Sequence, residues 1–295
     1  MRFRPGWLRR VLQVPVVPTL GPVHPDTLRP ELFDEVVAAA HTGEMLPFDK
    51  ERRWSRSKSE TVLVDEIVHR PDLTIIPTLF RRGTGMIKTH VYSPTTPDTA
   101  ALRTATRRWC TEFGAATGRV IWFTPDSPQI DAVTGTRILL KVFTEDDLSA
   151  PAGDPAAEIR ELDACPPPVQ DTFGQLADQV PDAGFGFLNR RWRAGHVDGP
   201  ILTAIANDTI VGAIGPLAVM PDRDGTPALL PQYFGVTPGH RGQGHGRALW
   251  RAATTWGARH GARYQILQAA TGEASERLFC AQGLTTLGFT CAVAA

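Results

Sequence analysis

A glycine-rich stretch that lies between an apolar run and a helical pattern constrains the fold of this chain more than any other feature. Residues 229–236 are mostly apolar, glycine occupies alternate positions within residues 242–246, and residues 247–260 repeat apolar side chains with a helical period. Glycines let a backbone approach a ligand and turn its N–H groups toward it. A helix that follows directs its positive end to the same place. The sequence therefore predicts a strand, a loop and a helix that together bind a phosphate-bearing cofactor.

Two widespread phosphate-binding motifs do not fit this stretch. A dinucleotide-binding fingerprint needs glycine at positions 242, 244 and 247, but position 247 is Arg247. A P-loop needs Gly-Lys-Ser/Thr after Gly239, and no lysine follows Lys141. The stretch fits Arg-x-x-Gly-x-Gly, which runs from Arg241 to Gly246.

This motif, placed between a strand and a helix, resembles the GNAT superfamily of N-acyltransferases, and the resemblance covers residues 157–295. It implies the GNAT fold, an α/β (α+β) architecture with a mixed, mostly antiparallel sheet and flanking helices. In that family the loop binds the pyrophosphate of acetyl-CoA, and the preceding strand pairs with the pantetheine arm through its backbone. The resemblance thus implies acetyl-CoA, or another acyl-CoA, as co-substrate, and no metal. The cofactor-binding residues that it implies are Gly235, Val236, Arg241, Gly242, Gln243, Gly244, His245, Gly246, Arg247 and Ser275.

Some of these positions also have simpler interpretations. Arg241 adds charge toward the phosphates or is a surface arginine in a salt bridge elsewhere. Ser275 hydrogen-bonds the cofactor or caps its own helix. His240 and His245 have the spacing of a metal pair, but no carboxylate or thiol accompanies them. We therefore expect the two histidines to line the loop.

The residues that usually transfer protons in the family are missing. Many members use a Glu on the fourth strand as the base, and the equivalent position, counted back from Val236, is Gln232. An amide cannot take a proton at neutral pH, but it can position a water or the acceptor. The Tyr that often serves as the acid is replaced by Phe279. Substitutes are conceivable, although we expect each to be structural or solvent-exposed: Tyr233, Tyr264, Asp222 and Asp224.

Periodicity and turn residues outline the rest of the C-terminal half. Residues 169–180 and 187–194 have helical patterns, and the aromatic segment around Phe187 either covers a substrate or packs helix faces. Asn207-Asp208 is a two-residue hairpin turn. The later elements are a strand at 229–236, a helix at 247–260 ended by Gly261, a strand at 264–268 and a helix at 273–282.

The N-terminal half shows a similar order of elements. Helices are predicted at 26–40 and 97–118, with strands at 60–67, 73–79, 85–92, 120–123 and 137–143. The turn before the second helix has no glycine, and Asp98 would repel a phosphate. Residues 1–150 are therefore a degenerate second GNAT domain in a tandem arrangement, or an unrelated α/β domain. Residues 151–156 have linker composition, and residues 157–295 form the acyltransferase domain.

Composition excludes several classes of protein. The net charge of the 295 residues is zero, so nothing global points to nucleic acid, and the basic run 50–58 is expected to be a solvated loop. No apolar run approaches the roughly 20 residues of a membrane span. The four cysteines have no metal-ligand spacing, and Pro15 and Pro18 interrupt the apolar stretch near the N-terminus. We expect a cytoplasmic protein.

These observations lead to one principal function and two alternatives. The principal one is an acyl-CoA-dependent N-acyltransferase that moves an acetyl or other acyl group to an amine of a small molecule or peptide, by direct transfer in a ternary complex. The first alternative is a non-catalytic CoA-sensing or interaction module, because the usual Glu and Tyr are absent. The second, transfer to a protein lysine or an aminoacyl-tRNA, depends only on the basic run 50–58.

Overall fold

A computed structural model describes residues 4–128, 134–149 and 158–295. The chain divides into two compact units, one formed by Met1–Leu140 with Ile266–Ala295 and the other by Lys141–Gln265. The C-terminal segment joins the first unit because strand β16 (Thr285–Ala294) pairs with two strands of the N-terminal half. The expected linker at 151–156 lies outside the described residues, and the domain limits 1–150 and 157–295 stay a prediction.

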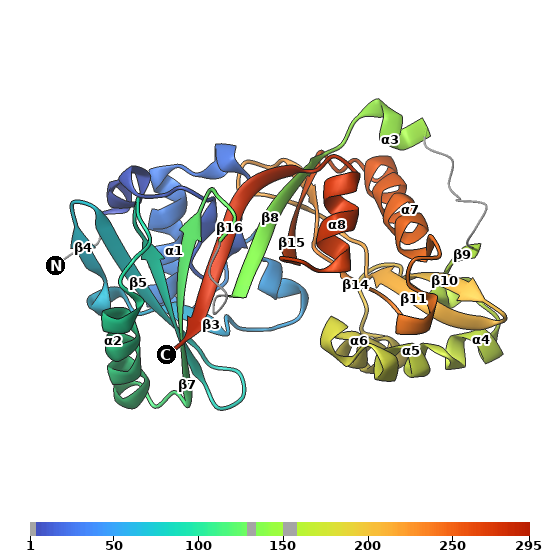
Figure 1. The fold of residues 1–295 in the computed structure, drawn as a ribbon, viewed down its shortest axis with the longest axis horizontal. Coiled ribbons are helices and arrows are strands. Elements are labelled where there is room, and N and C mark those ends of the chain that lie inside the picture. The colour runs from blue at the N-terminus through green and yellow to red at the C-terminus, as the bar shows by residue number, and fades with distance from the viewer. Residues whose placement is uncertain (1–3, 129–133, 150–157) are drawn as a thin grey trace. The chain divides into compact units, whose positions relative to one another are not determined.

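The first unit is built on a mostly antiparallel sheet (Figure 1). Its strands include the run β8-β16-β7-β6-β5-β3, and β4 pairs with β5. Within this run of described strands, the β6–β7 pair is parallel and the others are antiparallel. The bounds are β3 Glu60–Val62, β4 Val68–Arg70, β5 Leu73–Phe80, β6 Met86–Tyr92, β7 Thr117–Thr124 and β8 Thr134–Val142. The predicted strand 60–67 is therefore wrong in extent, because a 3-10 turn at Val64–Glu66 interrupts it.

Helix α2 (Thr99–Glu112) covers one face of this sheet. Leu102 and Trp109 are buried against Val91, Val120 and Trp122, in a cluster of apolar side chains that alternate along β6 and β7. The helix ends earlier than the predicted 118, because Gly114 has a φ of +66° and β7 begins at 117. The other elements of this unit are η1 Pro5–Arg10, β1 Val16–Val17, β2 Gly21–Pro22, η2 Pro25–Thr27, α1 Pro30–Thr42, η3 Lys50–Arg53 and α8 Ala274–Ala281.

The second unit contains a separate four-stranded sheet in which every pair is antiparallel. Its order is β14-β11-β10-β9, with β9 Glu158–Glu161, β10 Leu202–Ala206, β11 Thr209–Gly215 and β14 Tyr233–Val236. Helix α7 (His245–Arg259) packs on one face. The helices on the opposite face are α4 Pro167–Asp171, α5 Phe173–Gln179 and α6 Phe185–Arg193 (Figure 1). Mixed α/β architecture with mostly antiparallel sheets and flanking helices confirms the predicted fold class. The remaining elements are α3 Glu145–Ser149, η5 Leu162–Ala164 and η6 Pro181–Ala183.

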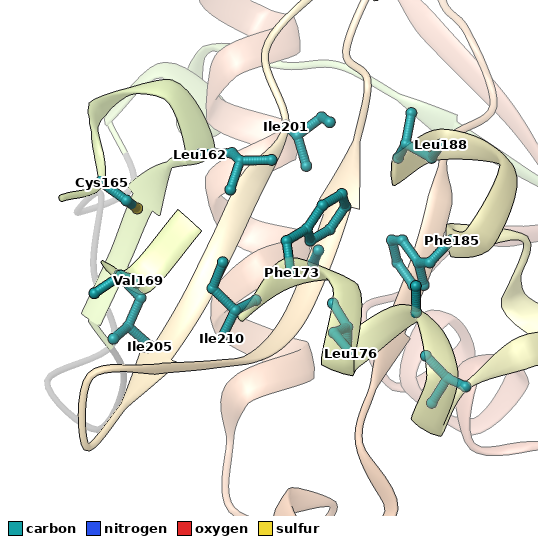
Figure 2. Packing of buried hydrophobic residues seen from close by; sticks show 13 residues of the cluster. Leu162, Cys165, Val169, Phe173, Leu176, Phe185, Leu188, Ile201, Ile205 and Ile210 are labelled. Atoms are coloured by element: carbon teal, nitrogen blue, oxygen red, sulfur yellow. The ribbon is translucent and has the colours of Figure 1, made fainter. Parts of the chain in front are cut away.

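The apolar side chains between α4–α6 and the sheet form the core of this face (Figure 2). Phe173 is fully buried at the centre and meets Phe185 edge-on, with ring centroids 6.0 Å apart. The predicted helix 169–180 is two helices that break at Thr172, whose hydroxyl accepts a hydrogen bond from the Ile210 N–H at 2.9 Å. α6 starts earlier than predicted because Gly184, with a φ of +77°, turns the chain there.

The predicted strand 229–236 is wrong as a single element. The chain forms β13 (Pro227–Leu229), which pairs with β12 (Val219–Pro221) and with the start of β15 (Tyr264–Ala270). It then forms β14, which pairs with β11. The strand changes partner across Leu230–Gln232, where Pro231 has no N–H to donate. The predicted turn at Asn207-Asp208 is confirmed, since both residues have positive φ.

Candidate functional site

Strand β14 is the last strand of its sheet, so its outer edge pairs with no strand of the described chain. Its inner edge lies close to β11: a Cβ at Gly212 would be 3.1 Å from the Gly235 carbonyl oxygen and from Leu249 Cδ1. A Cβ at Gly235 would be 3.0 Å from the Phe185 ring. The small residues therefore hold β14 between α6 and α7 while its backbone edge stays accessible for pairing.

The loop after β14 is held by its own polar side chains. The Thr237 N–H donates to the Val211 carbonyl at 2.8 Å, and the buried Thr237 hydroxyl lies 3.0 Å from His240 Nδ1. Arg241 Nε donates to the Val236 carbonyl at 3.1 Å, and Gln243 Nε2 donates to the Gly239 carbonyl at 3.1 Å. The N–H groups of His240 and Arg241 donate to the Thr237 and Pro238 carbonyls, so the first half of the loop satisfies its own polar groups.

Helix α7 begins without a side-chain cap. Gly242 and Gly244 have φ angles of +78° and +91°, which L side chains rarely adopt, and Gly244 is the N-cap residue. In the described part of the chain, the backbone N–H groups from Gly242 to Arg247 donate to no protein acceptor. The first turn, which includes Gly246, has no acidic residue. This helix start can bind an anion with its N–H groups and its dipole.

His245 is the first residue of α7, and its side chain is buried under this loop. The exposed fraction is 5%, and Nδ1 has no hydrogen-bond partner within the described residues. Burial, and the neighbouring His240 to a lesser extent, lower the pKa of His245 below its ordinary value. The two rings meet edge-on with centroids 6.0 Å apart. The imidazole is therefore neutral at pH 7, and an anion at the helix start would favour its protonation.

The Gln232 side chain lies at the break between β13 and β14. Its Nε2 donates to the Leu230 carbonyl, and its Oε1 accepts a hydrogen bond from Gln265 Nε2 at 2.8 Å. Sequence reasoning missed Gln265, which is fully buried and whose Oε1 has no partner within the described residues. A polar amide inside an apolar strand was the available signal, because buried amides need partners. The two amides fix the backbone where the strand changes partner.

The side chains named in the sequence analysis as substitute acids or bases have structural contacts instead. The Tyr264 hydroxyl donates to Asp222 Oδ2 at 2.8 Å, and burial followed by Asp222 raises the pKa of Tyr264 well above its ordinary value. Asp222 Oδ1 accepts from the N–H groups of Asp224 and Thr226, both at 2.9 Å. These residues stabilise the β12–β13 turn. Tyr233 packs its ring against the start of α6, where a Cβ at Gly184 would be 2.5 Å from Tyr233 Cε1.

Two predicted positions lie in α8 of the first unit. Ser275 is half-buried near the start of this helix, and no side-chain hydrogen bond caps the helix, so Ser275 does not act as its N-cap. Phe279 is buried, with 4% of its surface exposed. The basic run 50–58 is not uniformly solvated: Lys58 is buried in an ion pair with Asp49, and burial lowers the pKa of Lys50 to about 8.

The described residues lack the marks of a membrane span and of a metal site. No helix among them is both long and apolar enough to cross a membrane. No group of three or more His, Cys, Asp and Glu side chains among residues 4–128, 134–149 and 158–295 is arranged to hold a metal ion.

Comparison with known proteins gave one family match and several similar structures. Residues 157–283 match the model of the acetyltransferase (GNAT) family. A GCN5-related N-acetyltransferase from Sphaerobacter thermophilus is 15% identical, with a TM-score of 0.48 over 76% of this chain and 80% of that one. A tandem GNAT protein from the clavulanic acid biosynthesis pathway is 13% identical, with a TM-score of 0.49 over 90% and 94%. A GCN5-related N-acetyltransferase from Kribbella flavida is 14% identical, with a TM-score of 0.44 over 78% and 88%. No curated protein matches the sequence.

Proposed function

We propose that the chain is an acyl-CoA-dependent N-acyltransferase, because residues 157–283 match the model of the acetyltransferase (GNAT) family. It moves an acetyl or other acyl group to an amine of a small molecule or peptide, by direct transfer in a ternary complex. The observation that supports this most is the uncapped start of α7, with its row of N–H groups that have no acceptor among the described residues.

The residues at this helix start fit the diphosphate of CoA. The N–H groups of residues 242–247 hold the phosphate oxygens, and Arg241 adds positive charge from the loop. A carboxylate here would repel the ligand, and the first turn of α7 contains none. The backbone of Gly235 and Val236 hydrogen-bonds the amides of the pantetheine arm, as an added strand pairs with a sheet edge. Ser275 is retained as a cofactor contact on the family resemblance alone.

The chain's own contribution to the chemistry is binding and orientation. The co-substrate supplies a reactive acyl thioester when bound. Gln232 holds the backbone at the start of β14 through two hydrogen bonds, and the second N–H and second oxygen lone pair of its amide position the acceptor or a water. Attack requires a neutral amine, since a protonated amine has no lone pair. Placing the two reactants side by side can supply much of the rate for a thioester.

We further propose that residues 1–150 are a degenerate GNAT domain and that the protein acts in the cytoplasm. The degenerate-domain assignment is supported by the order of strand, turn and helix from β6 to α2, which repeats the order from β14 to α7. An unrelated α/β domain is the alternative. An experimental structure of the protein tests the degenerate-domain assignment. When its two halves are superposed, equivalent strands must have the same neighbours in the two sheets.

The decisive experiment separates binding from turnover. Acetyl-CoA should raise the Tm of the protein by several degrees, as expected for a ligand well above its Kd. A panel of amines should then release CoA thiol continuously, measured with a thiol reagent. The absence of any Tm shift with acetyl-CoA and longer acyl-CoAs would reject the proposal. A shift without thiol release on any amine would favour the CoA-sensing module, which is motivated by Gln232 and Phe279 at the positions of the usual Glu and Tyr.

A further inference from the structure

An exposed aromatic ring stands next to the start of β14. Phe187 on α6 is 37% exposed, one of few large apolar side chains so exposed among the described residues. Its ring centroid lies 6.3 Å from that of Tyr233, the first residue of β14, at an interplanar angle of 50°. Phe185 and Leu188 point from α6 into the core (Figure 2). Phe187, about 200° around the helix from Phe185, faces away from that core.

A guanidinium group lies beside this aromatic pair. The Arg190 Nη1 atom is 3.8 Å from the position that a Cβ would take at Gly186, so the side chain folds back over the residue that precedes Phe187. Within the described residues no carboxylate pairs with the exposed Arg190. Arg193, one turn later, pairs with Asp171 at 3.8 Å. Phe187, Tyr233 and Arg190, which we call the aromatic–arginine patch, therefore offer an apolar face and a positive charge together.

This patch lies at the end of β14 that is remote from the helix start. A strand rises about 3.3 Å per residue, so the backbone of Tyr233 lies about 13 Å from that of Thr237. If the diphosphate binds at α7 and the pantetheine arm follows β14, the acyl group reaches the Tyr233 end of the strand. The patch then faces the acceptor and not the nucleotide. This step rests on the proposed function.

Among the described residues, the groups that the sequence suggested as bases near this end of β14 are engaged in other contacts. The Gln232 amide is hydrogen-bonded at both ends, and Asp222 is held by the Tyr264 hydroxyl and by turn N–H groups. Asp182, in the exposed η6 turn before α6, is the carboxylate to test. Without a base, the acceptor nitrogen must be neutral at pH 7 by its own chemistry, as an amine bonded directly to an aromatic ring is.

We propose that the acceptor is an aromatic amine of low basicity that carries an acidic group. Its ring stacks on Phe187 and Tyr233, and its carboxylate or phosphate pairs with Arg190. The nitrogen lone pair forms a bond to the acyl carbon, and the carbon–sulfur bond breaks. The nitrogen loses one proton to solvent and the leaving thiolate takes one up, so the products are the amide and CoA thiol.

Four probe amines separate the three parts of this proposal. 4-Aminobenzoate has the ring, the acidic group and the weakly basic nitrogen. Aniline lacks the acidic group, and 4-(aminomethyl)benzoate has a basic nitrogen. 6-Aminohexanoate has a basic nitrogen and no ring, so its comparison with 4-(aminomethyl)benzoate isolates the contribution of the ring. With acetyl-CoA at pH 7, 4-aminobenzoate should have at least a tenfold higher kcat/KM than each of the other three. Calorimetric titration of 4-aminobenzoate into the protein saturated with CoA gives a second readout that does not depend on turnover.

Paired variants assign the effects to residues. Arg190→Gln should weaken 4-aminobenzoate binding about tenfold and leave aniline unchanged, whereas Arg193→Gln on the same helix should change neither. Phe187→Ala should weaken both aromatic amines, and Leu148→Ala, which removes another exposed apolar side chain of this unit, should weaken neither. The Kd of CoA should stay the same in all four variants. Asp182→Asn should retain turnover of 4-aminobenzoate.

The outcomes separate this inference from the proposed function. If acetyl-CoA does not bind, both the proposed function and the acceptor inference are rejected. If acetyl-CoA binds and 6-aminohexanoate or 4-(aminomethyl)benzoate reacts as fast as 4-aminobenzoate, the proposed function stands and the acceptor class is wrong. Loss of turnover in Asp182→Asn would make Asp182 a base and overturn the low basicity. Binding of acetyl-CoA with no binding of any probe overturns the aromatic–arginine patch as an acceptor site.

Discussion

Two strand–turn–helix junctions of the chain, β6–α2 and β14–α7, differ in how the helix begins. From β6 to α2, Asp98 Oδ1 accepts hydrogen bonds from the N–H groups of Ala100 and Ala101 at 3.0 and 3.4 Å. From β14 to α7, the N-cap is Gly244, and the chain supplies no acceptor for the N–H groups within the described residues. β6 pairs with a strand on both edges, whereas β14 pairs with β11 alone.

The difference shows what a helix start needs in order to bind a ligand. A carboxylate at the N-cap satisfies the first N–H groups and compensates the helix dipole from within the chain. A glycine leaves both to be satisfied by water or by an anion from outside. The order of strand, turn and helix is the same in both places. The residue at the N-cap therefore determines whether the first N–H groups of the helix are satisfied by the chain or are available to an anion.

The largest expected effect comes from placing a carboxylate at the β14–α7 junction, which has no side-chain cap and is called the open junction below; the β6–α2 junction, capped by Asp98, is called the closed junction. Gly244→Glu should weaken acetyl-CoA binding by at least about 100-fold. The new side chain strains a residue in the left-handed conformation, and its carboxylate repels the diphosphate. Each charge-assisted hydrogen bond that is lost contributes about 1.5–3 kcal/mol of binding free energy. Calorimetry measures the Kd. Gly225→Glu is the control, since Gly225 has a φ of +81° in an exposed turn of the same unit. Equal losses in both variants would show that strain alone, and not the site, is responsible.

Arg241 should have the next largest effect. Arg241→Ala should weaken acetyl-CoA binding about tenfold through the loss of a charged hydrogen-bond donor, and this loss should shrink as salt is added. Arg251→Ala, which removes an exposed arginine further along α7, should leave the Kd unchanged. If Arg241→Ala does not change the Kd, the role of Arg241 is structural, through its hydrogen bond to the Val236 carbonyl.

The closed junction should respond in stability and not in binding. Asp98→Ala should lower the free energy of unfolding by about 1 kcal/mol, the usual effect of losing an N-cap side chain. Urea denaturation followed by circular dichroism measures it. The Kd of acetyl-CoA should be the same as in the unmodified protein. If Asp98→Gly binds phosphate, both junctions are able to bind phosphate when the N-cap side chain is absent. The difference between the two junctions would then be due to Asp98 alone.

The smallest expected effect is the pH dependence of the open junction. The pKa of His245 is lowered in the folded protein, so the unfolded chain binds more protons below pH 6.5 and stability falls as the pH drops through that value. A bound diphosphate favours the protonated ring, so ligand binding should take up protons and strengthen about two- to threefold from pH 7.5 to 5.5. Calorimetry in buffers of different ionisation enthalpy measures the uptake.

His245→Asn should remove this part of the pH dependence, and the difference from the unmodified protein excludes the titration of the ligand's own phosphates. His260→Asn, near the end of the same helix, should leave it unchanged. Equal proton uptake in all three proteins would mean that His245 does not sense the ligand.

The sequence allowed the second junction to be predicted closely, because its signals are local. Glycines mark the turn, the helical period marks α7, and Asn207-Asp208 marks the hairpin. The break at 230–232 was not predicted, although Pro231 was a local signal against a continuous strand. The change of pairing partner from β15 to β11 depends on distant segments and has no local signal. The same holds for Gln265, whose role depends on a contact 33 residues away.

The open edge of β14 also affects how the protein behaves without its ligand. An unpaired strand edge can add a strand from another molecule and so begin aggregation. β14 has only four residues, and Pro231 and Pro238 lie just outside its two ends, where neither can donate to a growing ladder. These prolines act as gatekeepers of a short exposed template. Replacing them would extend the unpaired edge of β14, and this edge would then pair more readily with another copy of the chain.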